Sequence, residues 1–340
     1  MMKDSYGREI NYLRISVTDR CNLRCRYCMP LEKTEGTGPV LSFEELLTVV
    51  RAVLPMGITR FKITGGEPLV RQGTVDFLSE LKRIPGVERV TLTTNGLLLH
   101  RDLEKLRSIG IDGINISLDT LNEQQYRRLT GIPEGKGGVS AVLDAVRASV
   151  SFGISTRLNA VLLEETKDQI LKLASLAEDL PLSVRLIELM PLGPAAFERS
   201  FSPKKALALL REQYPDLSPV SREAIFEEGR RKSPYGNGPA EYYASESLKG
   251  FIGMIRAVEE PFCESCNRLR LTSGGQLKAC LCYDIGIDLL PILRSGKAEG
   301  VLEKEIREAF RSAIWKKPWE NCFQRADDVT EKRTMNEIGG

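Results

Sequence analysis

The sequence predicts an α/β fold with a parallel sheet, which we expect to be an incomplete (β/α)6 TIM-type barrel whose open side is covered by a cysteine-rich C-terminal domain. Short β-branched runs alternate with amphipathic helical stretches from about residue 10 to residue 190. The alternation recurs about six times at roughly 30-residue spacing, as in βα units. A doubly wound sheet would show the same alternation, whereas six units in a barrel would leave an open side for another segment.

The expected strands, in chain order, are residues 12–17, 60–64, 89–94, 113–118, 155–162 and 183–189. Two of these stretches, GINISL and RLNAVL, mix polar with apolar residues, which suits a sheet with a functional inner face. The expected helices are residues 42–54, 74–84, 102–110, 138–153 and 166–180. The first helix opens with Ser42 and Glu45, which have the spacing of a capping box.

Residues 215–250 are rich in proline, glycine, serine and charge, so we expect a linker or loop with little core of its own. We therefore place the barrel in residues 1–230 and the C-terminal domain in residues 231–340. A chain of 340 residues is long enough for one large domain and one small one.

The composition is that of a soluble enzyme, with 42% hydrophobic and 28% charged residues. A formal net charge of +2 argues against a general nucleic-acid or membrane-surface role, so we expect neither among the partners. The N-terminal stretch MMKDSYGREI lacks the apolar region of a signal peptide, and no apolar run approaches the roughly 18 residues of a spanning helix. We therefore expect a cytoplasmic protein.

Eight cysteines in a reducing compartment are more often ligands or catalytic groups than disulfides. Cys21, Cys25 and Cys28 directly follow the first strand, at the end where parallel α/β folds collect their chemistry. Structural zinc needs four ligands, and the single histidine, His100, is far along the chain. Zinc and buried inert thiols remain alternatives, but three thiolates without a fourth favour an iron–sulfur cluster with one iron left open.

The CxxxCxxC spacing, together with TGGEP at residues 64–68, resembles the radical S-adenosylmethionine (SAM) superfamily. The resemblance implies a [4Fe–4S] cluster held by Cys21, Cys25 and Cys28, whose open iron binds SAM and whose electron releases a 5′-deoxyadenosyl radical. It also implies SAM contacts at four further positions, namely Tyr27, Gly66, Ser117 and Met190. Without the cysteines, TGGEP would be read as a strand-to-helix turn, and Ser117 and Met190 as ordinary strand-end residues.

A second group of cysteines lies near the other end of the chain, at positions 263, 266, 280 and 282. Four cysteines leave a zinc ribbon possible. Arg268 and Arg270 occupy alternate positions, so in an extended segment both would point to one face and form an anion site beside the metal. The chain ends in Gly339-Gly340, which in an arbitrary tail would be a frayed end.

This combination resembles the GTP 3′,8-cyclase family over essentially the whole chain. The resemblance implies a second [4Fe–4S] cluster on Cys263, Cys266 and Cys280, with its open iron facing the guanine of GTP; Cys282 is an extra thiol that could compete with Cys280. It implies GTP contacts at Arg14, Lys62, Thr93, Arg157, Arg268 and Arg270. It also implies a catalytic tail that carries Gly339 and Gly340 into the active site. Lys62 stands where the family more often has arginine, and Arg157 where it commonly has lysine.

The function implied is conversion of GTP to (8S)-3′,8-cyclo-7,8-dihydroguanosine 5′-triphosphate, the first step of molybdenum cofactor biosynthesis. The expected partners are GTP, an electron donor and the downstream cyclic pyranopterin monophosphate synthase, with the chain a monomer or homodimer. Two alternatives stay open. One is a radical SAM enzyme that uses its auxiliary cluster on a peptide or another small molecule, and the other is a zinc-stabilised binding module without catalysis.

Overall fold

One large sheet organises the computed structural model, which describes residues 2–29, 38–221 and 235–339. Its strands are β3 (Tyr12–Ser16), β4 (Arg60–Thr64), β5 (Arg89–Thr94), β6 (Gly113–Ser117), β7 (Thr156–Leu162), β8 (Ser183–Glu188), β9 (Ser218–Pro219), β10 (Glu241–Ala244), β11 (Phe251–Ile255), β12 (Arg268–Leu271), β13 (Gln276–Lys278) and β14 (Gly286–Asp288). They follow the order β14-β13-β12-β3-β4-β5-β6-β7-β8-β11-β10-β9. A separate antiparallel pair is formed by β1 (Met2–Lys3) and β2 (Glu9–Ile10).

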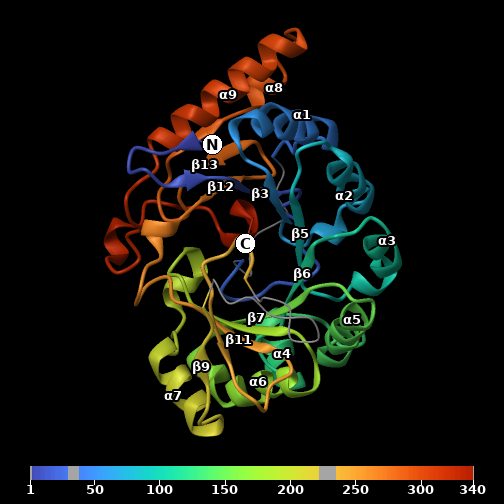
Figure 1. Cartoon of the computed structure of the whole chain (residues 1–340), viewed down its shortest axis with the longest axis vertical. Coiled ribbons are helices and arrows are strands. Elements are labelled where there is room, and N and C mark those ends of the chain that lie inside the picture. The colour runs from blue at the N-terminus through green and yellow to red at the C-terminus, as the bar shows by residue number, and fades with distance from the viewer. Residues whose placement is uncertain (1, 30–37, 222–234, 340) are drawn as a thin grey trace.

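The middle of this sheet is parallel throughout, from β12 at one side to β11 at the other. Antiparallel strands extend both edges, with β13 and β14 beyond β12, and β10 and β9 beyond β11. Figure 1 shows the sheet as an open arc, with the C-terminal end of the chain near its middle. The predicted α/β fold with a parallel sheet is therefore confirmed.

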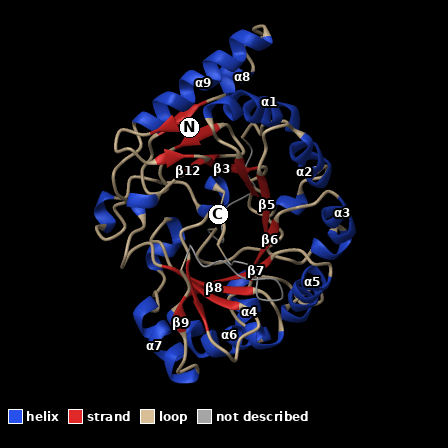
Figure 2. Cartoon of the chain, in the orientation of Figure 1, coloured by secondary structure: helices blue, strands red, loops and turns tan. Residues whose placement is uncertain are grey.

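Most of the helices lie along the outer side of the arc, whereas α10 lies near its middle, beside the C-terminal end (Figure 2). They are α1 (Phe43–Val53), α2 (Thr74–Arg83), α3 (Leu103–Ser108), α4 (Glu123–Thr130), α5 (Val139–Ser151), α6 (Ile170–Asp179), α7 (Pro203–Gln213), α8 (Leu290–Leu293), α9 (Glu299–Trp315) and α10 (Met335–Ile338). The predicted capping box is present at α1, where the Ser42 side chain accepts from the Glu45 backbone and the Glu45 carboxylate accepts from the Ser42 backbone. Helix α9 packs against α1, so the C-terminal region covers the start of the sheet.

The two faces of the sheet differ in polarity because side chains alternate along each strand. Leu13, Ile15, Phe61 and Ile63 point toward the helices and are fully buried. The alternate positions on the inner face are mostly polar or charged, from Arg14 onward around the arc. The core thus lies between sheet and helices, and the inner face is left for chemistry.

Segments far apart in sequence complete the sheet. Strand β12 pairs with β3, so that Arg270 lies opposite Arg14, while β11 pairs with β8 at the other side. The C-terminal region therefore continues the sheet on both edges. The expected domain boundary between residues 230 and 231 lies outside the described residues.

Most expected strands and helices are present within a residue or two of their predicted ends, but three expectations need correction. The helix expected over 166–180 begins as a 3-10 turn at Glu164–Gln169, and only then becomes α6. Five helices were not predicted, namely α4, α7, α8, α9 and α10. The expected linker at 215–250 contains β9 and β10 in its described part, because both strands hydrogen-bond to the edge of the sheet.

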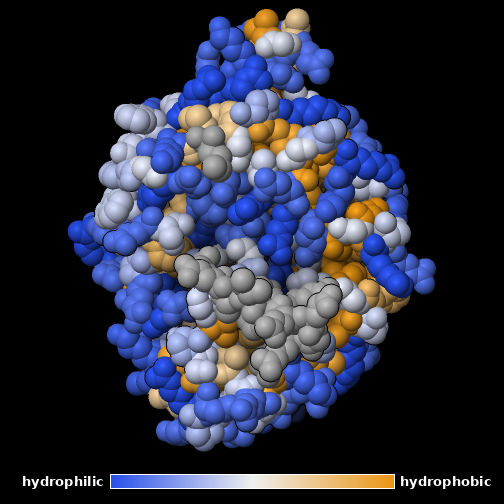
Figure 3. All heavy atoms as spheres, in the orientation of Figure 1, coloured by the Kyte–Doolittle hydropathy of each residue, from blue (hydrophilic) through white to orange (hydrophobic). Residues whose placement is uncertain are grey.

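No helix among the described residues is long and apolar enough to span a membrane. Hydrophilic residues dominate the face of the molecule shown in Figure 3.

Candidate functional site

The first cysteine loop follows the end of β3 and holds three half-buried thiols. Burial raises the pKa of Cys21 to about 11, and burial together with the charge of Cys21 raises the pKa of Cys28 to about 12. Burial and the neighbouring thiolates raise the pKa of Cys25 in the same way. Three thiols that oppose one another's ionisation need a positive centre to become thiolates, which a cluster of iron ions supplies.

Gly66 allows the TGGEP turn to pack directly against the backbone that leads into this loop. A Cβ atom on Gly66 would lie 2.5 Å from the carbonyl oxygen of Arg20 and 2.7 Å from that of Asp19. The Gly66 amide donates to the carbonyl of Thr18 over 2.7 Å. Glycine is required here because a side chain would clash with the chain's own backbone.

Glu67, the next residue of the turn, has a fully buried carboxylate. It accepts hydrogen bonds from the backbone amides of Leu69 (3.0 Å) and Asn95 (2.6 Å) and from the Thr94 hydroxyl (2.8 Å). Burial outweighs these bonds and raises the pKa of Glu67 to about 7. The carboxylate therefore ties the TGGEP turn to the end of β5.

The other residues expected at the SAM site lie near the same end of the sheet. The Tyr27 hydroxyl donates to Asp119 over 2.6 Å, and Asp119 also accepts from the Val161 amide over 2.8 Å, which fixes the ring of Tyr27. Ser117 ends β6 and is half-buried. Met190 follows β8 and packs against the apolar cluster that contains Ile338 of the tail.

The second cysteine loop, between β11 and β12, contains Cys263 and Cys266, whereas Cys280 follows β13; all three thiols are half-buried. Burial opposes ionisation of Cys266, yet the charges of Arg268 and Lys317 hold its pKa at about 6. A hydrogen bond from Cys282 lowers the pKa of Cys280 to about 6. Cys266 and Cys280 are therefore better prepared for the thiolate form than the first three thiols, whereas burial raises the pKa of Cys263.

Cys282 and Cys322 are both buried behind the second loop. The sulfur atoms of Cys280 and Cys282 are 3.5 Å apart, and the Cys322 amide points at the Cys282 sulfur from 3.4 Å. Burial and the bond with Cys280 raise the pKa of Cys282. The sulfur–sulfur contact thus ties Cys282 directly to Cys280.

No three His, Cys, Asp or Glu side chains in the described part of the chain are arranged to hold a metal ion together. The first three thiols share a loop and interact electrostatically. Cys263 and Cys266 share another loop, and Cys280 is grouped with them by its electrostatic interaction with Cys263.

The inner face of the sheet carries a dense group of basic side chains between the two loops. The five expected members are Arg14, Lys62, Arg157, Arg268 and Arg270. Burial lowers the pKa of Lys62 well below its usual value, and the charges of the neighbouring arginines lower it further. Burial and the charge of Arg14 likewise lower the pKa of Arg270 well below its usual value. A bound anion would relieve such repulsion, so the group has the charge and the burial that an anion site requires.

Arg185 belongs to this basic face and was not predicted. It lies on β8, is 6% exposed, and has the largest effect among the charges that lower the Lys62 pKa. Its guanidinium donates to the Asn159 side-chain oxygen over 2.6 and 2.9 Å and also to that of Asn115. An arginine within the expected buried strand SVRLIEL was the signal that could have revealed it.

Two threonines of β5 add polar groups to the same face. The hydroxyls of Thr91 and Thr93 are buried and have no hydrogen-bond partner within the described residues, which suits a contact to a polar ligand. A pocket near the start of the strands is lined by Tyr12, Lys62, Arg89, Thr91, Asn115, Arg157, Arg185, Gly236, Asn237, Gly238 and Tyr242.

The C-terminal tail lies against this basic face rather than in solvent. The carbonyl oxygen of Gly339 accepts from the Arg270 guanidinium over 2.9 Å, and the Asn336 side chain donates to the Asp19 carbonyl over 3.1 Å. A capping box between Thr334 and Glu337 starts α10. Gly340 lies outside the described residues. The tail thus contacts both the segment before the first cysteine loop and Arg270 of β12.

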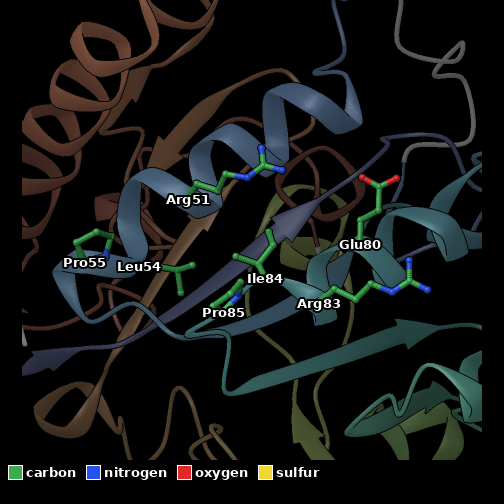
Figure 4. Close-up of a pocket in the computed structure, with 7 residues that line it drawn as sticks. All are labelled: Arg51, Leu54, Pro55, Glu80, Arg83, Ile84 and Pro85. Carbon is green, nitrogen blue, oxygen red and sulfur yellow. The ribbon is translucent and has the colours of Figure 1, made fainter.

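A second hollow, shown in Figure 4, lies on the helical side of the sheet, away from the cysteines. It is lined by Arg51, Leu54, Pro55, Glu80, Arg83, Ile84 and Pro85. None of the expected site residues contributes to it.

Two family models match the chain in succession. The Radical SAM superfamily model matches residues 15–177, and the model described as Molybdenum Cofactor Synthesis C matches residues 182–323. The first match contains the cysteine loop after β3, and the second contains the loop between β11 and β12. Fold and site together define a radical SAM protein, a class that uses S-adenosylmethionine and an iron–sulfur cluster.

Relatives narrow the class to one family. The GTP 3′,8-cyclase of Clostridium perfringens is 38% identical over 342 residues, which span 100% of both chains. That of Moorella thermoacetica is 39% identical over 345 residues, again 100% of both, and that of Peptoclostridium acidaminophilum is 40% identical over 346 residues, 100% of this chain and 98% of the relative. The chain belongs to the GTP 3′,8-cyclase family.

Among solved structures, Streptococcus suis SuiB bound to S-adenosylmethionine has a similar fold. The TM-score is 0.62 and the sequence identity 14%, over 93% of this chain and 68% of that one. The similarity concerns the fold alone.

Proposed function

We propose that the chain is a radical SAM enzyme that converts GTP to (8S)-3′,8-cyclo-7,8-dihydroguanosine 5′-triphosphate, the first step of molybdenum cofactor biosynthesis. The observation that carries the proposal is the basic inner face, which lies between two groups of three cysteines and is contacted by the tail. A nucleoside triphosphate fits this place because its charge would relieve the repulsion among the buried cations.

We propose two [4Fe–4S] clusters, one held by Cys21, Cys25 and Cys28 and the other by Cys263, Cys266 and Cys280. The buried thiols of the first loop and the cation-flanked thiols of the second fit such clusters. When bound, the first cluster and SAM supply reductive cleavage of the sulfonium bond and hydrogen abstraction from GTP.

The chain's own residues position the two small molecules. Tyr27, held by Asp119, would lie against the adenine of SAM, while Gly66, Ser117 and Met190 would line the rest of the molecule. On the GTP side, the basic residues would bind the phosphates and the Thr93 hydroxyl would accept or donate a bond to the nucleotide. These basic residues are Arg14, Lys62, Arg157, Arg185, Arg268 and Arg270.

We assign Gly339 and Gly340 to the catalytic tail, which would exclude water above the reacting sugar. The contact between Gly339 and Arg270 supports this assignment.

The finer architecture that we propose is an incomplete (β/α)6 TIM-type barrel in residues 1–230, with a cysteine-rich domain of residues 231–340 across its open side. The open order of the sheet supports it. We further propose a cytoplasmic monomer or homodimer that receives electrons from a separate donor and supplies cyclic pyranopterin monophosphate synthase.

The test is anaerobic incubation of the reconstituted protein with GTP, SAM and a strong reductant. Equal amounts of 5′-deoxyadenosine and cyclised nucleotide are expected. Cys21→Ala should abolish both products, whereas Arg268→Ala should retain uncoupled SAM cleavage and weaken GTP binding. Cyclisation at the normal rate in Arg268→Ala, or zinc without iron and sulfide in the purified protein, would contradict the proposal.

A further inference from the structure

Asn321 lies in the loop after α9, where the chain passes over the second cysteine loop. Its backbone amide and its side-chain Nδ2 both donate to the Cys263 sulfur, each over 3.3 Å. Nδ2 also donates to the Ala257 carbonyl over 3.1 Å, and Oδ1 accepts from the Phe323 amide over 3.0 Å. One residue therefore aims two N–H groups at a single sulfur, and its side chain is held on the other side as well.

The segments on both sides of this contact are held by Arg8. Its guanidinium donates to the carbonyl oxygens of Cys263 (2.8 Å), Pro318 (2.7 Å) and Trp319 (2.8 Å). Arg8 is 7% exposed and forms an ion pair with Asp4 at 2.6 Å. Because the loop and the chain beside Asn321 are held together, the N–H groups stay aimed at the sulfur.

The first cysteine loop has a weaker equivalent. The Asn95 side chain lies 4.0 Å from the Cys21 sulfur, and the Leu23 amide donates to it over 3.4 Å. The side-chain donor of Asn321 is thus 0.7 Å closer to its sulfur than that of Asn95, the difference between 4.0 and 3.3 Å.

Hydrogen bonds to the sulfurs of an iron–sulfur cluster favour its reduced form, because reduction places more negative charge on those sulfurs. We propose that Asn321 is a positioning residue that holds the Cys263 thiolate and raises the reduction potential of the second cluster. This inference rests on the proposed function, in which Cys263 ligates that cluster.

The experiment is a potentiometric titration followed by electron paramagnetic resonance. Its parent is the full chain with Cys21, Cys25 and Cys28 all replaced by alanine, so that the signal comes from the second cluster alone. In this parent, Asn321→Ala and Asn321→Leu should shift the midpoint to a more negative potential. Leucine has nearly the size of asparagine but no donor, so it separates the loss of the hydrogen bond from the loss of volume.

Gln324→Ala is the matched control. Gln324 is exposed and its amide donates to the Val258 carbonyl over 2.8 Å, so it ties the same segment to the same loop without contacting a sulfur. Its midpoint should equal that of the parent. If Asn321→Ala loses iron, the midpoint potential of Asn321→Leu is the test of the proposal. The role of Asn321 is overturned if the midpoint potential is unchanged in Asn321→Leu, or if it shifts equally in Gln324→Ala. A parent that binds no second cluster overturns the proposed function instead.

Discussion

Replacing Gly339 with alanine would place a methyl group in the most crowded part of the tail's contact with the sheet. A Cβ atom there would lie 2.8 Å from the Ser16 Cβ and 2.8 Å from the Thr64 hydroxyl oxygen. Gly339 also has a φ of +87°, which alanine adopts only with strain. Both effects oppose the docked tail and leave the undocked tail unchanged.

The magnitude follows from these two effects. The left-handed backbone costs alanine about 1–2 kcal/mol. If the methyl group displaces the carbonyl from Arg270, loss of that charged hydrogen bond costs about 1.5–3 kcal/mol more. The sum, about 2.5–5 kcal/mol, shifts the docking equilibrium by roughly two to four powers of ten.

Hydrogen exchange measured by mass spectrometry on the C-terminal peptide reports this equilibrium. In Gly339→Ala the amides of α10 should lose protection, cyclisation should fall with docking, and both clusters should retain their iron. Gly296→Ala is the control, because Gly296 has a similar φ of +71° but open space around its Cα. A Gly339→Ala variant with native tail protection and native cyclisation would refute the steric argument.

The remaining predictions concern Arg185 of the basic face and the buried carboxyl group of Glu67. Arg185→Met should weaken anaerobic GTP binding by at least tenfold, because it removes a cation from the basic face and the donor to Asn115 and Asn159. Calorimetry measures the Kd, and an unchanged value would exclude Arg185 from the site. Glu67 has a folded-state pKa of about 7 against an ordinary 4.5. Its contribution to the free energy of unfolding is therefore greatest below pH 4.5 and is lost as the pH rises through 7. The total loss is about 3 kcal/mol. Thermal unfolding from pH 5 to 8 should therefore show a shallower decline in Glu67→Gln, and equal slopes in the two proteins would count against the raised pKa.

Local patterns carried much of the fold. Short β-branched runs predicted β4 and β5 at their observed bounds, and the spacing of Ser42 and Glu45 identified the start of α1. Helix α4 was not predicted because its sequence, EQQYRRLT, is short and mostly polar. Its apolar face is therefore too narrow to give a clear helical pattern. Residues 218–219 form a strand only because they pair with β10 at the edge of the sheet. No local sequence pattern predicts this pairing.

The sequence by itself determined which residue types are present and where they cluster: two sets of thiols at fixed spacing, a glycine turn, and arginines on alternate positions of one short strand. Only the tertiary structure decided their neighbours. The register of β12 on β3 places Arg270 beside Arg14, and the path of the tail brings Gly339 to Arg270. These contacts join residues that are 256 and 69 positions apart, so they depend on how whole strands pair and pack. Spacing along the chain reflects only the few residues on either side.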